Sequence, residues 1–274
     1  MTLKVAIKEG GNMGLLANKD FTLEKYKKLC LAAVNSKYTN LTFEEYFSRE
    51  DYNAECFIIL RHDIDENARY ALDVARVEHD LNLKATYYFR MKRKTYVSTI
   101  MDEVAALNHE IGFHYETIDK CNGDIGKALV LFGSELSMFR QRYAVKTACM
   151  HGNPLSNHDN KAIWQQGKPS DFGLLGEPYL SLDYSKFAYF SDSGRSWDQN
   201  TRNKVKDRVN AKHSIMPRNT DELIEVIKNG EPQDICVLTH PERWSKNLSD
   251  YSKRYLIDMS YWVGKAVIHQ VRRR

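Results

Sequence analysis

Short apolar runs alternate along the chain with longer segments in which apolar residues recur every three or four positions. Residues 56–60 form an apolar, isoleucine-rich run that is too short for a helix and is therefore predicted to be a strand. The segment 66–81 has amphipathic spacing instead, which predicts a helix. This alternation repeats at least four times, a pattern typical of parallel strands with helices packed outside them.

The same hydrophobic periodicity predicts the remaining strands and helices. Further strands are predicted at 84–89, 109–115, 146–152, 186–192 and 234–241. Further helices are predicted at 21–34, 42–48, 97–107, 124–142, 220–229 and 249–270. Together they predict one α/β domain over residues 1–274, with a helical preamble at 1–55 and a C-terminal helix within 249–274.

The composition of the chain indicates which partners and which cellular compartment are expected. The 40 Lys and Arg residues barely exceed the 36 Asp and Glu residues, and no basic stripe interleaved with aromatics is present, so nucleic acid is not an expected partner. The five cysteines are widely spaced, which favours reduced thiols over disulfides. The start of the chain lacks a secretory signal pattern and no window is apolar enough for a membrane span. A cytoplasmic protein is therefore expected, and the sequence leaves its oligomeric state open.

Polar residues gather where the predicted strands end. They are found at 62–65, 114–116, 151–153, 192–195 and 240–242. In parallel α/β folds the carboxyl ends of all strands open on one face, where functional sites are built. The sequence therefore predicts a site at this rim.

Asp63 and Asp65 suggest what that site holds. Residues i and i+2 of an extended chain point the same way, so both carboxylates are expected to face one small volume while Ile64 turns into the core. Two anions so close favour a bound divalent cation, which would take one carboxylate and leave the other free as a base. The alternative is an N-cap for one aspartate and pairing with Arg61 or Arg69 for the other. Three histidines at other strand ends favour the metal.

The stretches "RHDID", "ATYYF", "HEIGFHYE" and "LTHP", in that order, resemble the polysaccharide deacetylase family, also known as the NodB-homology group or carbohydrate esterase family 4. The resemblance covers roughly residues 57–241 and is closest to the branch with an H-D-x-D motif, associated with surface-polysaccharide (O-antigen) biosynthesis. It implies a distorted (β/α) barrel with a metal at the carboxyl rim, most often zinc. It also implies a hydrolase that removes acyl groups from N-acylated sugars.

The family's first motif implies that Asp63 is the general base and Asp65 a metal ligand. His114 matches the first histidine of the second motif, whereas Ile118 stands where the family has another histidine. His151 or Glu116 is then the candidate for the remaining ligand.

The last motif implies that His240 acts on the leaving-group side as the catalytic acid. The third motif keeps Pro154 but lacks its arginine, so Arg61 or Arg195 is expected to orient Asp63. The residues expected to line the substrate site are Arg61, His62, Glu116, Asn153, Asp192, Arg195, Trp197, Glu242 and Trp244.

The expected substrate is an N-acylated, most simply N-acetylated, amino sugar. A cytoplasmic protein would meet it as a nucleotide-linked or lipid-carrier-linked sugar. One alternative is hydrolysis of a non-sugar amide or formamide C–N bond. Another is a catalytically lapsed glycan-binding protein, because Ile118 replaces a ligand of the resembled family.

Overall fold

The computed structural model describes residues 19–51, 55–153, 156–197, 209 and 215–271, and the side chains of 261–271 are excluded. Pro154 lies outside the described residues, as do the ends 1–18 and 272–274 of the predicted domain.

Seven parallel strands form one sheet in the order β5-β4-β3-β2-β7-β6, with β1 paired to the beginning of β2. The strands are β1 (Thr39–Leu41), β2 (Phe57–Ile64), β3 (Thr86–Phe89), β4 (Glu110–Tyr115), β5 (Ala148–Met150), β6 (Phe187–Ser191) and β7 (Asp234–Thr239). The sheet curls into a half-barrel, and the described strands include no pairing between the edges β5 and β6. The predicted α/β class with parallel strands is therefore confirmed.

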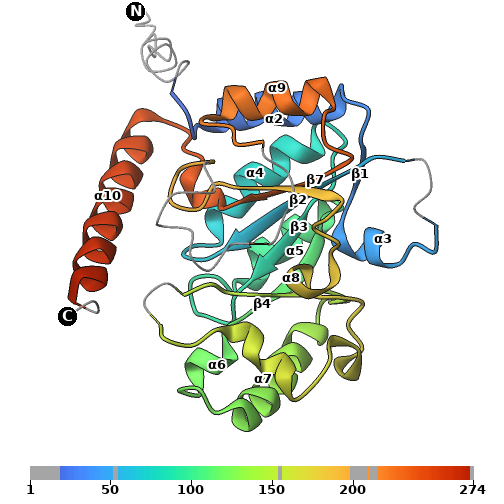
Figure 1. Ribbon diagram of the computed structural model, residues 1–274, viewed down its shortest axis with the longest axis vertical. Coiled ribbons are helices and arrows are strands. Elements are labelled where there is room, and N and C mark those ends of the chain that lie inside the picture. Colours follow the sequence, from blue (N-terminus) through green and yellow to red (C-terminus); the bar gives the residue numbers. More distant parts are fainter. Residues whose placement is uncertain (1–18, 52–54, 154–155, 198–208, 210–214, 272–274) are drawn as a thin grey trace, which may run out of the picture.

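Helices cover the convex side of the sheet (Figure 1). The helices of the described chain, not all of which lie on that side, are α2 (Leu23–Val34), α3 (Phe43–Phe47), α4 (Arg69–His79), α5 (Ser98–Ala106), α6 (Thr117–Lys120), α7 (Ile125–Arg140), α8 (Pro178–Ser181), α9 (Thr220–Asn229) and α10 (Leu248–Val271). Short 3₁₀ turns lie at Asn160–Gln165, Pro169–Phe172 and Pro241–Arg243. Among the described residues, no helix has both the length and the apolar character needed to cross a membrane.

The strands are buried on both faces, and their side chains divide between two cores. On β2, Ile58 and Leu60 join the outer core between sheet and helices, whereas Phe57 and Ile59 join a smaller core inside the curl. This division follows from the two-residue period of a strand. The inner face becomes polar beyond Ile59, and that change places the candidate site at the carboxyl end of the half-barrel.

Most predicted elements are present, with differences at their ends. Strand β2 continues through Ile64, so Arg61 to Asp63 belong to the strand rather than following it. Helix α4 begins at Arg69 rather than near residue 66. The elements β1, α6 and α8 were not predicted, because three or four residues are too few to show a period.

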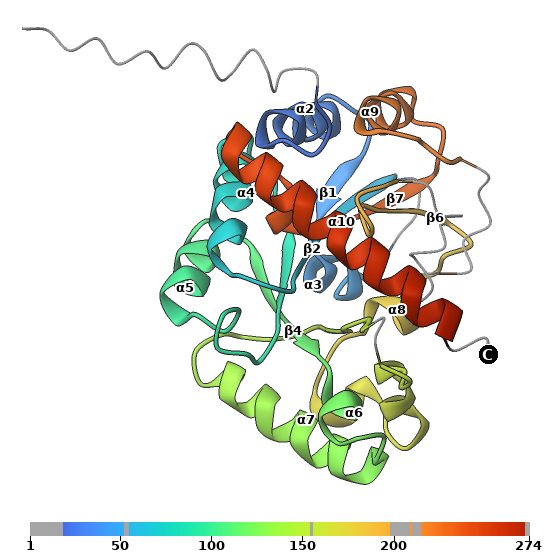
Figure 2. The same ribbon diagram turned by 90° about the vertical axis from the view of Figure 1, so that its left-hand side faces the viewer.

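Helix α10 crosses the mouth of the half-barrel (Figure 2). Its Arg254 contacts Glu66, which follows β2, at 2.5 Å. Its Asp258 contacts Arg195, which follows β6, at 3.3 Å. The helix is therefore attached by ion pairs to the loops that follow two strands at the carboxyl rim.

Candidate functional site

Arg61 and Asp63 lie on the inner face of β2 and bind each other. The Nε and Nη2 atoms of Arg61 donate to the two oxygens of Asp63 at 2.8 and 2.7 Å. Burial alone would raise the pKa of Asp63, but Arg61 and then His114 lower it below its usual range. Asp63 is thus an oriented, ionised carboxylate, and Arg61 is the one of the two expected arginines that contacts it.

Asp65 extends the same face and lies among three imidazoles. Its Oδ1 lies 3.4 Å from Nε2 of His114 and 3.5 Å from Nε2 of His151, and its Oδ2 lies 3.6 Å from Nε2 of His240. Asp63 and Asp65 therefore face one volume, as the strand alternation predicts. Burial opposes ionisation of Asp65, but His151 and the other imidazoles hold its pKa well below the usual range.

The register of the sheet brings these residues together. Asp63 pairs with Tyr88 of β3, and Tyr88 pairs with Gly112 of β4. A Cβ at Gly112 would lie only 2.4 Å from the Tyr88 ring, so glycine is required for this ring to pack on the inner face. His114 follows Gly112 by two residues and so emerges on the same inner face, above the Tyr88 ring.

The hydrogen bond of His114 determines its tautomer. Its Nδ1 is 2.9 Å from the carbonyl oxygen of Cys149, and a carbonyl can only accept, so Nδ1 carries the proton. In the neutral ring Nε2 then has a free lone pair, and this atom lies 3.4 Å from both Asp63 and Asp65. A lone pair facing two carboxylates is favourable only if a proton or a cation lies between them.

His151 is a neutral imidazole beside Asp65. Burial lowers its pKa to about 4, although Asp65 acts in the opposite direction. Glu116, the other candidate third ligand, is bound by Arg90 and by Lys92, the latter at 3.0 Å. His151 is therefore the more available of the two ligands.

As the side chains stand, no group of three or more His, Cys, Asp or Glu residues in the described part of the chain has the arrangement of a metal site. The pairwise distances nevertheless suit one. Two ligands of a tetrahedral zinc lie about 3.3–3.4 Å apart, given Zn–N and Zn–O distances of about 2.0–2.1 Å. The separations from Asp65 Oδ1 to the His114 and His151 nitrogens are 3.4 and 3.5 Å. Asp65 Oδ1 is also buried without a hydrogen-bond partner, so these residues fit a divalent cation.

His240 lies near the other oxygen of the Asp65 carboxylate, Oδ2, whereas His114 and His151 lie near Oδ1. The His240 ring is held by Asp192. Its Nδ1 lies 2.6 Å from Asp192 Oδ1, and its backbone N–H donates to Oδ2 at 3.0 Å. Burial and Arg243 lower the pKa of His240, but Asp192 and Asp65 outweigh them and raise it to about 9. His240 is thus an oriented imidazolium at neutral pH.

Glu242 adds a further titratable group beside His240. It is buried, and its Oε2 has no hydrogen-bond partner in the structure. Burial raises its pKa to about 7, against the effect of His240 and with a contribution from Asp65. The predicted site residue Asn153 is half-buried in the segment that follows β5.

The structure does not bring His62 to this rim. His62 points to the convex side of β2, where Nε2 contacts Glu78 of α4 at 2.7 Å and Nδ1 contacts Thr239 at 2.6 Å. The strand period accounts for this position, since His62 lies between Arg61 and Asp63, which both face inward.

Trp197, Trp244 and Arg195 are likewise not arranged as a substrate wall. The two indoles are 0% and 2% exposed and pack on Phe21 in the outer core. Trp244 is connected to the candidate site only through Asp192, to which its Nε1 donates a hydrogen bond at 3.1 Å. Arg195 is engaged by Asp258 and by the Tyr251 ring at 4.6 Å, so it anchors α10.

Two residues near the site do not belong to the predicted set of site residues. Arg90, just after β3, donates to the carbonyl oxygen of Asp65 at 2.9 Å and also binds Glu116. Tyr179 of α8 covers the guanidinium of Arg61 at 4.7 Å. The segment "RMKRK" at 90–94 was the available signal for Arg90, since its charges directly follow a predicted strand.

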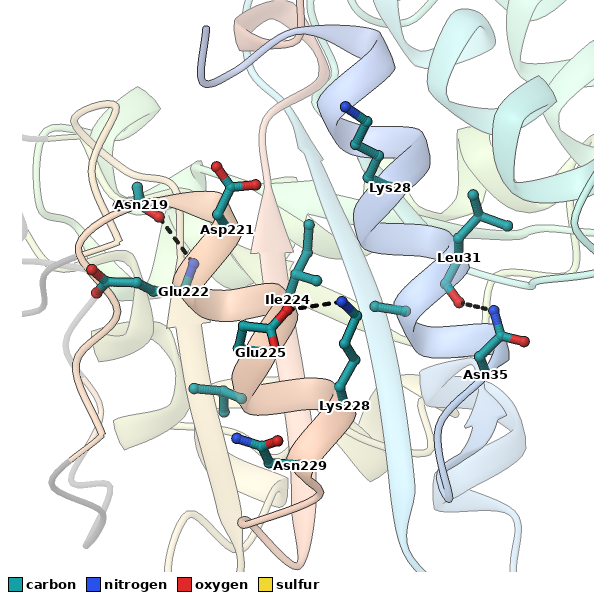
Figure 3. Close-up of a pocket in the computed structure, with 12 residues that line it drawn as sticks. Lys28, Leu31, Asn35, Asn219, Asp221, Glu222, Ile224, Glu225, Lys228 and Asn229 are labelled. Atoms are coloured by element: carbon teal, nitrogen blue, oxygen red, sulfur yellow. Dashed lines mark hydrogen bonds and ion pairs between the residues drawn. The ribbon is translucent and has the colours of Figure 1, made fainter. Parts of the chain in front are cut away.

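A groove in the described chain lies elsewhere, between α2 and α9 (Figure 3). It measures about 670 Å³ and is lined largely by charged and amide side chains, among them Lys28, Asp221 and Lys228. None of the rim residues lines it. The groove is therefore separate from the candidate site.

Fold and site together define an α/β protein with a polar, mainly carboxylate and imidazole site at the rim of a curled parallel sheet. No family model, curated protein or solved structure matches the chain. The function is therefore inferred from the site itself.

Proposed function

We propose that this chain is a metal-dependent hydrolase of the NodB-homology type that removes an N-acyl group, most simply acetyl, from an amino sugar. The observation that carries the proposal is that an oriented carboxylate, Asp63, and an oriented imidazole, His240, both lie close to Asp65. Asp63 is an ionised carboxylate held by Arg61, and His240 is an imidazolium held by Asp192. An oriented base two residues from Asp65 and an oriented acid whose Nε2 lies 3.6 Å from the Asp65 carboxylate suit amide hydrolysis.

Asp65, His114 and His151 are the residues that would hold the metal. When bound there, a divalent ion supplies Lewis-acid polarisation of the acyl carbonyl and lowers the pKa of the attacking water. The free Nε2 of His114 and the neutral ring of His151 support this ligand set.

The chain's own groups would then act in sequence. Asp63 takes a proton from water as the oxygen attacks the acyl carbon. His240 donates its proton to the amide nitrogen as the C–N bond breaks, which releases a carboxylic acid and a free amino sugar. Arg61 and Asp192 act as positioning residues, because each holds a catalytic group rather than the substrate.

The test combines metal analysis with product release. Purified protein is analysed for bound metal and then incubated with N-acetylated amino sugars, formamides and ureides, with acetate or formate measured. Release from amino sugars alone supports the proposal, whereas release from formamides or ureides alone would assign a non-sugar amide hydrolase.

The Asp63→Asn variant completes the test. We expect it to lose acetate release by at least about 10³-fold, because the base is removed without a change in size. If wild type and variant both bind an amino sugar and neither releases acetate, the chain is a glycan-binding protein instead.

A further inference from the structure

The turn after β3 presents a run of cations at the same rim. Residues 90–94 read Arg-Met-Lys-Arg-Lys, and Lys92, Arg93 and Lys94 are exposed. In the described part of the chain Lys92 pairs with Glu116, while Arg93 and Lys94 form no ion pair. Surface cations are commonly only solvated, so exposure alone does not make these side chains a binding site. Their position relative to the candidate site is the relevant property.

That position is fixed by the backbone. The amides of Thr95 and Tyr96 donate to the Lys92 carbonyl at 3.0 and 2.7 Å, and the Thr95 hydroxyl donates to the Arg90 carbonyl at 2.8 Å. The Lys94 carbonyl accepts from the amide of Ala68, in the segment that follows Asp65. The turn is therefore a braced structure rather than a loose loop.

Arg90 connects this turn directly to the candidate metal site. Its Nη1 donates to the carbonyl oxygen of Asp65 at 2.9 Å, its Nη2 binds Glu116, and its Nε is buried with no hydrogen-bond partner. Glu116 also receives Lys92 at 3.0 Å and Lys120 at 3.8 Å, so one carboxylate is shared by three cations. Lys120 also pairs with Glu135 at 2.7 Å, so the cations of this region that form no ion pair in the described part of the chain are Arg93 and Lys94, which follow Lys92 on the same turn.

A braced cationic turn fixed to a metal-site residue has the properties of an anion subsite. A substrate whose amide lay between Asp63 and His240 would extend outward from the rim by the width of its sugar ring. The group on its far side would then reach Lys92 of this turn, because Lys92 contacts Glu116 at 3.0 Å and Glu116 lies 3.6 Å from Nδ1 of His151 at the site. Amides and hydroxyls do not need a run of cations, whereas a phosphate or diphosphate does.

We propose that Lys92, Arg93 and Lys94 form a subsite for the phosphoryl group of a phosphorylated amino sugar. This inference rests on the proposed deacylase function. It narrows the substrate class to sugars that carry a phosphate or diphosphate, whether from a nucleotide or from a lipid carrier.

The test uses the double variant Arg93→Ala/Lys94→Ala. Its control is Lys27→Ala/Lys28→Ala, which removes two exposed cations from α2. The ratio of kcat/KM for N-acetylglucosamine 1-phosphate to that for N-acetylglucosamine is measured at low and at 0.5 M salt. We expect the turn variant to lower this ratio by about tenfold or more at low salt, with the control unchanged. An equal ratio in wild type and both variants would overturn the subsite.

A binding measurement separates this inference from the proposed function. Inorganic pyrophosphate is titrated into wild type and both double variants by calorimetry. If pyrophosphate binds wild type and the control but not the turn variant, the subsite stands even where no acetate is released. If pyrophosphate does not bind wild type, or if it binds the turn variant as tightly as wild type, the subsite is wrong. Where it stands, hydrolysis of a nucleotide-diphosphate sugar and of a prenyl-diphosphate sugar identifies the source of the phosphate.

Discussion

The Asp192 carboxylate and the His240 imidazole meet at 2.6 Å across the ends of two neighbouring strands. Asp192 also accepts from Arg243 at 2.9 Å and from the Trp244 indole at 3.1 Å. It is held so firmly that its pKa lies at about 2, because Arg243 and His240 outweigh the effect of burial. This carboxylate is the reason that His240 is both oriented and protonated at neutral pH.

Asp192→Asn is therefore expected to lower kcat by about 100-fold with little change in KM, because the proton donor loses its orientation and its charge. The anion that raises the pKa of His240 is removed, so NMR titration should find the imidazole pKa below its wild-type value of about 9. Asp250→Asn is the control, because Asp250 is half-buried on the first turn of α10 and contacts only Asn247 among the described side chains. An unchanged His240 titration in Asp192→Asn would contradict this role.

The choice between His151 and Glu116 as third ligand predicts different metal affinities. His151→Ala should weaken zinc binding by about 10- to 100-fold, whereas Glu116→Gln should have a smaller effect, because Glu116 already binds Arg90. Zinc affinity is measured by competition with a chelator of known affinity. His79→Ala removes an exposed imidazole from α4 and is the control. A larger loss in Glu116→Gln than in His151→Ala would reverse the assignment.

The alternation of β2 made part of this site predictable. The two-residue period places Asp63 and Asp65 on one face, and it also implies that His62 faces the helices. The composition of the H-D-x-D motif, in contrast, favours His62 as a residue of the substrate site. The structure therefore corrects an inference for which the sequence already held the evidence.

Other contacts could not be read from the sequence, because they join distant segments. Arg254 meets Glu66 across 188 residues, and Arg90 meets Glu116 across 26. Both pairs depend on how the strands are ordered in the sheet, which a local pattern does not specify. The aromatic residues near the rim show the same limit: Trp197 and Trp244 are core residues, whereas Tyr179 covers Arg61.

A buried acidic residue on the apolar stripe of α4 predicts a dependence of stability on pH. Glu78 is fully buried and accepts from Tyr26 and Tyr87, each at 2.5 Å, and from His62 at 2.7 Å. Burial would raise its pKa, but His62 and its other partners hold the pKa below the usual range. A lowered folded-state pKa contributes stability above the unfolded pKa of about 4.3, and this contribution is lost as pH falls further.

Glu78→Gln should therefore lower the free energy of unfolding by about 3 kcal/mol at pH 7, with the gap narrowing below about pH 4. Urea denaturation across this pH range measures the effect. Glu103→Gln, which loses only an exposed pair with Arg76, should cost less than about 1 kcal/mol. A deficit that stayed constant down to pH 3 would show that the ionised form of Glu78 is not the source.

The attachment of α10 to the rim gives the last prediction. Arg254 binds Glu66 at 2.5 Å and Asp258 at 2.7 Å, and its own side chain is only 9% exposed. Because Glu66 directly follows Asp65, this one guanidinium connects the helix to the candidate metal site. Arg254→Ala should leave Glu66 without its cation and leave Asp258 with Arg195 alone, and so loosen the beginning of α10 from the rim.

We expect faster amide hydrogen exchange over residues 248–258 in Arg254→Ala, with protection of the β2 and β7 amides unchanged. Lys253→Ala removes the same charge from the adjacent, exposed position and should leave exchange as in wild type. If α10 only rests on the rim through apolar packing, both variants will exchange alike. If instead the ion pairs hold it, restoring a cation with Arg254→Lys should recover part of the protection, because lysine keeps the charge but not the two-sided contact.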